Sequence, residues 1–269
     1  MPLKTFIVDA FTDTPFKGNP AGVCIVEEAL PETLMQNIAM ELGLSETAFV
    51  QKHEERNSYS IRFFSPQKEI PLCGHATIAS SKVMAAMHGC REIHFVNIDQ
   101  VDIPVVISGD DITISFPVYS LEAATAPPAM LQALGIGKTK AVMYSRQNNI
   151  LMLEIQSAKA LADLRPDFTA LKASHNSING VLVTAASDKT GYDYEYRYFW
   201  PWAGTEEDPV TGGVQTFLAP YWQEKLDTST MHAFQSSQRT GTMQVELKDN
   251  KVYITGRAVM ILEGQLLTI

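Results

Sequence analysis

The sequence predicts an α+β fold of two similar halves, in which each half is a curved, mostly antiparallel sheet wrapped around one central helix. The first observation is a repeated segment: FFSPQKEIPLCGHAT (63–77) is echoed by FWPWAGTEEDPVTGGVQT (199–216), and its glutamate, proline and glycine recur 138 positions later. The second is VVISGDDITISF (105–116), which VELKDNKVYITG (245–256) echoes at an offset of 140. Two matches at nearly one offset indicate a duplicated unit.

The first half begins with two strand-like runs, 4–11 and 21–26, separated by the turn-rich TDTPFKGNP. Residues 31–43 predict a helix, because apolar residues recur every four positions and a glycine closes the segment. Two further strands are expected at 47–52 and 59–65.

The third observation is a pair of helices that carry almost no charge. Residues 74–89 contain Lys82 as their only formally charged residue apart from histidines, and residues 211–223 contain none. A surface helix would carry a charged stripe, so both are expected to be enclosed on most sides. Pro220 is expected to bend or end the second helix.

The boundary between the halves is expected near the proline-bearing segment 120–129, which gives domains of residues 1–118 and 119–269. The chain ends in a hairpin with its turn at Lys248–Asn250, and periodicity does not decide whether the last strand returns to the first half. The remaining strands are expected at 92–98, 103–107 and 111–117 in the first half and at 140–146, 150–156, 179–186 and 193–200 in the second.

Composition excludes several classes of function. The chain has 269 residues, 45% hydrophobic and 19% charged, as in a soluble globular protein. Its net charge of −9 disfavours general binding to nucleic acid or anionic membranes, and no run of 18 apolar residues is present. Three cysteines at unrelated spacings form neither a disulfide framework nor a zinc pattern, so no metal is expected and a cytoplasmic location is the default.

Each repeated segment runs from a strand through a proline-bearing loop to a glycine and a buried helix. Gly74 opens one helix and Gly212-Gly213 opens the other. Free N–H groups at a helix start attract anions, so a small carboxylate is the expected ligand, bound in a cleft between the halves. The alternative is that these glycines only allow a tight turn into the helix.

The ionisable residues near these glycines are open to two interpretations. His75 in the first helical turn is either a neutral acid–base group or a packed core histidine. Asp208 before the second helix is either functional or a turn former. Pattern alone does not select Glu46. Cys73 and His75 are not expected to pair directly, because residues two apart on a helix do not face each other.

Several blocks resemble the PhzF-like family of phenazine-biosynthesis isomerases: GNPAGV (18–23), LSETAFV (44–50), LCGHATIAS (72–80) and EDPVTGG (207–213) with LAPYW (218–222). The closing segments 239–247 and 254–266 are similar to that family too, so the resemblance covers nearly the whole chain. It implies the diaminopimelate-epimerase-like fold, a cofactor-independent proton shift and a homodimer.

The resemblance also implies roles for individual residues. Glu46 would carry the proton, with support from His75 and Asp208. Asn19, Cys73, Gly74, Gly212 and Gly213 would bind the substrate, although many relatives have a hydroxyl residue where this chain has Gly213. The block Cys-Gly-His-Ala differs from the Ala-Gly-His-Pro of the phenazine enzyme, so phenazine synthesis is not implied.

Two other functions stay open. An epimerase or racemase of this fold uses two opposed thiols, and this chain has Cys73 at one position but Asp208 at the other. A relative without catalytic activity that binds a metabolite is the third class.

Overall fold

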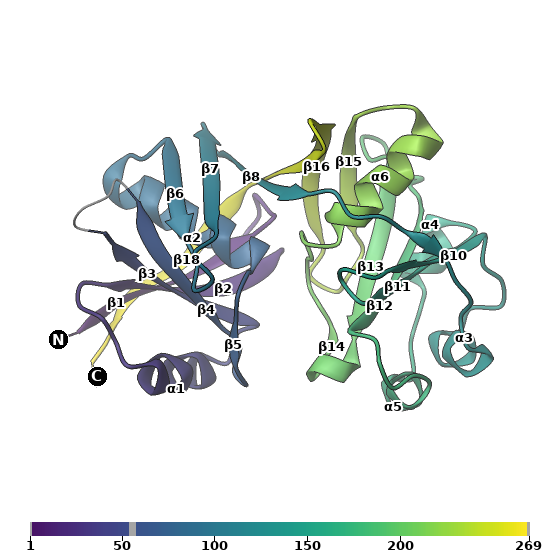
Figure 1. Cartoon of the computed structure of the whole chain (residues 1–269), viewed down its shortest axis with the longest axis horizontal. Helices are drawn as coiled ribbons and strands as arrows, with labels where there is room; N and C mark the ends of the chain where they lie inside the picture. The colour runs from purple at the N-terminus through teal and green to yellow at the C-terminus, as the bar shows by residue number, and fades with distance from the viewer. Residues whose placement is uncertain (1, 54–57, 268–269) are drawn as a thin grey trace. The chain divides into compact units, whose positions relative to one another are not determined.

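The computed structural model describes residues 2–53 and 58–267 and consists of two compact units (Figure 1). The first unit holds the chain up to Ser115 together with the segment from Tyr253 onward, and the second holds Phe116–Val252. The chain crosses between the units along two strands, β8 (Asp111–Pro117) and β17 (Lys251–Gly256).

In the first unit a mostly antiparallel sheet surrounds one helix, α2 (Gly74–His88), which packs against β1, β2, β3 and β18. The strand pairs β2–β3 and β4–β6 are parallel, while β1–β2, β3–β4, β4–β5, β6–β7, β7–β8 and β1–β18 are antiparallel. The last strand therefore pairs with the first. The strands are β1 (Leu3–Ala10), β2 (Asn19–Val26), β3 (Glu46–Lys52), β4 (Tyr59–Phe64), β5 (Glu69–Ile70), β6 (Glu92–Val96), β7 (Asp102–Ser108) and β18 (Ala258–Leu266).

Glycines end both helices of this unit. α1 (Glu32–Leu42) stops at Gly43 and α2 at Gly89, and each glycine is left-handed, with its N–H bonded to a carbonyl four residues back. In α2, nine of the fifteen residues are buried, so this helix is enclosed as its lack of charge predicts.

The second unit repeats the pairing scheme of the first. Its pairs β11–β12 and β13–β15 are parallel, while β10–β11, β12–β13, β13–β14 and β15–β16 are antiparallel. The series matches β1 to β7 strand for strand, as expected for a duplicated unit. The strands are β9 (Glu122–Ala123), β10 (Ala141–Ser145), β11 (Ile150–Glu154), β12 (Gly180–Ala186), β13 (Tyr194–Trp200), β14 (Thr205–Glu207), β15 (Thr230–Gln235) and β16 (Gly241–Lys248).

The central helix of the second unit, α6 (Gln215–Leu226), starts later than predicted. Residues 211–214 form a turn instead, in which Gln215 N–H donates to the Gly212 carbonyl. Two adjacent glycines favour a turn over a helix, because glycine loses the most conformational freedom on ordering. Pro220 lies inside α6 and does not end it.

Short helices cover this unit where the sequence analysis predicts none: α3 (Pro128–Leu134), α4 (Ala158–Ala162) and α5 (Phe168–Ala173). The expected linker 120–129 contains β9 and the start of α3. Two of these helices have N-cap residues of the usual kind. The Ser157 side chain accepts a hydrogen bond from Ala160 N–H at the start of α4, and the Asp167 side chain accepts one from Ala170 N–H at the start of α5. The remaining helical turn, η1, spans Pro201–Ala203.

The predicted hairpin between β16 and β17 is present, with left-handed backbone at Asp249 and Asn250 as a two-residue turn requires. Among the residues that the structure describes, no helix is both long and apolar enough to span a membrane.

Candidate active site

Three elements of the first unit bring Glu46, His75 and Asn19 together. Glu46 is the first residue of β3, which follows directly on the turn that ends α1. Asn19 is the first residue of β2, the parallel neighbour of β3, and His75 lies in the first turn of α2. The side chains of all three residues are buried.

His75 is the centre of a chain of hydrogen bonds. Its Nε2 lies 3.1 Å from Glu46 Oε2, and its Nδ1 lies 3.3 Å from Asn19 Nδ2. In the neutral ring with its proton on Nε2, Nε2–H donates to Glu46 while Nδ1 accepts from the Asn19 amide. A buried carboxyl group in contact with an imidazole is suited to general acid–base chemistry.

Cys73 contacts His75 directly, contrary to the prediction from helical spacing. Its Sγ lies 3.4 Å from His75 Nδ1. The prediction was wrong because Cys73 is the N-cap of α2, with extended backbone (φ −143°, ψ 110°), so the spacing rule for two helical residues does not apply.

The pKa values of His75 and Cys73 are both raised. Burial by itself lowers the pKa of His75, but interactions with Cys73 and Glu46 outweigh it and raise that pKa well above its ordinary value. Burial raises the pKa of the Cys73 thiol, against the opposing effect of His75. Since the thiol is then neutral at pH 7, the partner that favours the protonated imidazole is Glu46.

Glu46, Cys73 and His75 also form a set of possible metal ligands, with ligand atoms within 4.8 Å of one another. A metal ion takes one nitrogen of an imidazole. Here Nδ1 lies nearer the thiol and Nε2 nearer the carboxylate, so the groups form a hydrogen-bonded chain rather than converging on one point. As they lie, these residues do not fit a metal centre.

Asp208 lies in the second unit, directly after β14, and is buried. Its N–H donates to the Tyr198 carbonyl at 3.1 Å, and its carboxylate accepts from the Thr211 hydroxyl. Gln235 binds the same loop twice, through the carbonyl of Asp208 (2.6 Å) and the N–H of Thr211 (2.7 Å). Both readings of Asp208 hold locally: it organises a turn and it presents a buried carboxylate.

Gly74 starts α2, whereas Gly212 and Gly213 lie in the turn that precedes α6. Two further side chains hold these loops and were not predicted from the sequence. Ser237 donates to the Pro209 carbonyl at 2.6 Å, and Asn97 donates to the Pro71 carbonyl at 2.9 Å. The repeat relates the two prolines, so their equivalence was available from the sequence, but nothing local marks their partners.

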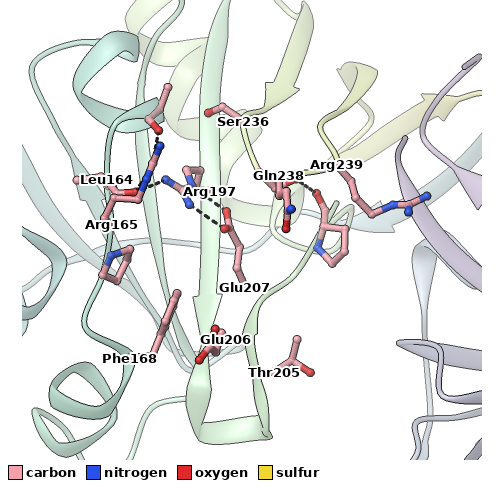
Figure 2. A pocket seen from close by; sticks show the side chains of 14 residues that line it. Leu164, Arg165, Phe168, Arg197, Thr205, Glu206, Glu207, Ser236, Gln238 and Arg239 are labelled. Carbon is pink, nitrogen blue, oxygen red and sulfur yellow. Dashed lines mark hydrogen bonds and ion pairs between the residues drawn. The ribbon is translucent and has the colours of Figure 1, made fainter. Parts of the chain in front are cut away.

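The second unit also contains a pocket of about 800 Å³ beside the Asp208 loop (Figure 2). Its wall includes Arg197 and Glu207, together with Pro209 and Phe168. In Figure 2 the Arg197 guanidinium lies between Leu164 and Glu207 and is bonded to both.

A sheet around a central helix, repeated in two units, defines the diaminopimelate-epimerase-like class. A probable proline racemase from Agrobacterium radiobacter has this architecture, with a TM-score of 0.64 at 10% identity over 98% of this chain and 93% of that one. The model of the PhzC-PhzF family, described as phenazine biosynthesis-like protein, matches residues 8–264, and the chain belongs to this family.

Two close relatives agree with this assignment. A PhzF family protein of Enterococcus faecalis has a TM-score of 0.93 and 37% identity over 100% of both chains. An uncharacterized isomerase of Halalkalibacterium halodurans is 36% identical over 99% of both chains. The family and these relatives support an enzyme of isomerase or epimerase type.

Proposed function

We propose that the protein is a cofactor-independent isomerase that moves a proton on a small, carboxylate-bearing metabolite. The observation that carries the proposal is the buried contact between Glu46 and His75 at 3.1 Å. Proton transfer by a positioned side chain contributes about 10²–10⁴-fold to a rate, and a site screened from water favours it.

Each residue has a proposed role. Glu46 carries the proton, His75 exchanges it with Glu46, and Asn19 fixes the ring through its contact with Nδ1. The start of α2 supports binding of a carboxylate, because the first N–H groups of a fifteen-residue helix attract anions. By the family resemblance, Asp208, Gly212 and Gly213 contribute to the reaction from the second unit.

An epimerase or racemase is the second candidate, since Cys73 stands at a helix start beside His75. That chemistry in this fold needs a second thiol opposite the first. At the offset of the repeat, the position that corresponds to Cys73 is Thr211, which has no thiol, and Cys24 and Cys90 lie elsewhere in the first unit. This disfavours a two-thiol mechanism.

The experiment is a metabolite screen in D₂O. Small acids are incubated with the wild-type protein and analysed by mass spectrometry, with Glu46→Gln as the control. The proposal expects an acid that is isomerised and gains deuterium with the wild type but not with the variant. If the product keeps the carbon skeleton and only one stereocentre inverts, the epimerase candidate replaces the isomerase.

A further inference from the structure

Each unit contains an ion pair of one arginine and one glutamate in the chain segment that precedes its central helix. We call these pairs, Arg62–Glu69 and Arg197–Glu207, the clamps. In the first unit, Arg62 Nε and Nη2 donate to the two carboxylate oxygens of Glu69, both at 2.7 Å. In the second unit, Arg197 Nε and Nη2 donate to the two oxygens of Glu207, again both at 2.7 Å. These two-bond pairs are the strongest and most directional kind of side-chain ion pair.

The surroundings of the clamps are the same as well. Phe64 is paired with Glu69 across the sheet, and Phe199 with Glu207. The guanidinium carbons lie 5.2 Å and 4.9 Å from the ring centres of Phe64 and Phe199. An arrangement of arginine, phenylalanine and glutamate is therefore preserved in both copies, while most of the flanking sequence differs.

The clamp of the second unit is the more buried and the more fully bonded. Only 8% of the Arg197 side chain is exposed, against 24% for Arg62. Its Nη1 also donates to the carbonyls of Leu161 (3.3 Å) and Leu164 (2.9 Å), which lie at and just after the end of α4. Arg197 thus joins β13, the end of α4 and the end of β14 at one point (Figure 2).

The clamp of the second unit lies next to Asp208 in the chain. Glu207 is the residue immediately before Asp208, and on the other side the loop is held by Gln235 and Ser237. Fixing Glu207 fixes the backbone from which the Asp208 side chain projects. A buried ion pair contributes little net stability, because desolvation offsets the attraction, so stability alone does not explain why the pair recurs.

We infer that Arg197 and Glu207 are positioning residues, which hold Asp208 and the Gly212–Gly213 turn in the geometry that the reaction needs. The inference rests on the role proposed for Asp208 in the isomerase. Misplacement of a catalytic group by about 1 Å costs about 10²-fold in rate, so loss of the clamp is expected to lower kcat.

The test compares Glu207→Gln with a matched control, Glu195→Gln. Glu195 lies on the same strand as Arg197, its side chain is fully buried, and it bonds to Lys189 at 2.6 Å rather than to a residue of the Asp208 loop. Both variants remove the charge of one carboxylate that is ion-paired on or beside β13; the Glu207 side chain is 16% exposed and the Glu195 side chain is fully buried. Arg197→Lys serves as a second variant that keeps the charge but loses the two-bond geometry.

The first readout needs no substrate. Amide hydrogen exchange is measured for residues 205–214, with β16 as the internal reference, at a fixed interval below each protein's melting temperature. The inference expects exchange at least about ten-fold faster in 205–214 for Glu207→Gln and Arg197→Lys, and unchanged there for Glu195→Gln. If residues 205–214 exchanged at the wild-type rate in both clamp variants, the inference would be overturned.

The second readout is turnover of an acid identified in the D₂O screen. The clamp variants are expected to lose at least about ten-fold in kcat with KM within about three-fold, while Glu195→Gln retains kcat. Normal kcat in the clamp variants overturns the inference and leaves the isomerase standing. If the wild type turns over no acid, the proposed function fails, and the exchange measurement alone decides whether the clamp orders the loop.

Discussion

Asn19 Nδ2 and His75 Nδ1 lie 3.3 Å apart, so the amide of the GNP segment fixes the imidazole ring at the start of α2. On its other side the ring contacts Glu46. Two strands and one helix, joined through a single imidazole, therefore determine where the Glu46 carboxyl group lies.

The raised pKa of His75 predicts how stability depends on pH. A group whose pKa is higher in the folded than in the unfolded state stabilises fully below the unfolded value, about 6.5 for histidine, and this stabilisation is lost as pH rises through the folded value. Above pH 6.5 the unfolding free energy is expected to fall with pH, by at most about 1.4 kcal/mol per pH unit for one proton. Urea denaturation between pH 5.5 and 9 measures the slope.

Glu46→Gln is the control for this slope, because it removes the partner that favours the protonated ring. Its stability is expected to fall most, relative to the wild type, at the acid end of the range. If the unfolding free energies of the two proteins changed with pH in parallel, the raised pKa of His75 would not depend on Glu46.

Cys73→Ala is expected to keep turnover within a few-fold of the wild type. The thiol contacts His75 Nδ1, but the Asn19 side chain contacts the same nitrogen, so the ring keeps a partner when the sulfur is removed. A buried cysteine commonly acts as a small hydrophobe. Steady-state kinetics and a melting curve check this, and loss of turnover in a folded Cys73→Ala protein would restore a thiol mechanism.

Gly18→Ala is expected to destabilise the protein by about 3 kcal/mol and to disturb the site. Gly18 has φ +68°, and an added Cβ would lie 2.1 Å from the backbone oxygen of Ala10, next to Asn19. Gly43→Ala is the matched control: its φ is +62° but nothing lies within 4 Å, so only about 1 kcal/mol is expected. Equal losses in the two variants, measured by denaturation, would rule out the clash.

Much of the fold follows from the sequence. The offset repeat and the uncharged helices predict two similar units with enclosed helices, and α2 begins and ends within one residue of the prediction. The predicted start of α6 is wrong by four residues because residues 211–214 form a turn, whose first residue, Thr211, is held by Gln235 from beyond the helix. The short helices α3 to α5 are too brief to give a periodic signal.

The site was less predictable than the fold. No local pattern marks Glu46, and only the family resemblance pointed to it, because its burial depends on the packing of β3 against its neighbours. The contact between Cys73 and His75 depends on a cap conformation that spacing rules do not describe. The recurrence of the clamp glutamate was visible in the repeat, but its pairing with an arginine in each unit was found only in the structure.

The central claim is that Glu46 carries the proton, and the most direct measurement is deuterium uptake from D₂O by Glu46→Gln. The variant keeps the shape of the side chain and a polar contact to His75 but exchanges no proton. With the acid found in the screen, it is expected to bind the ligand normally and to lose about 10²-fold or more in both kcat and deuterium incorporation. Turnover and deuterium uptake within a few-fold of the wild type would contradict the account and remove Glu46 from the mechanism.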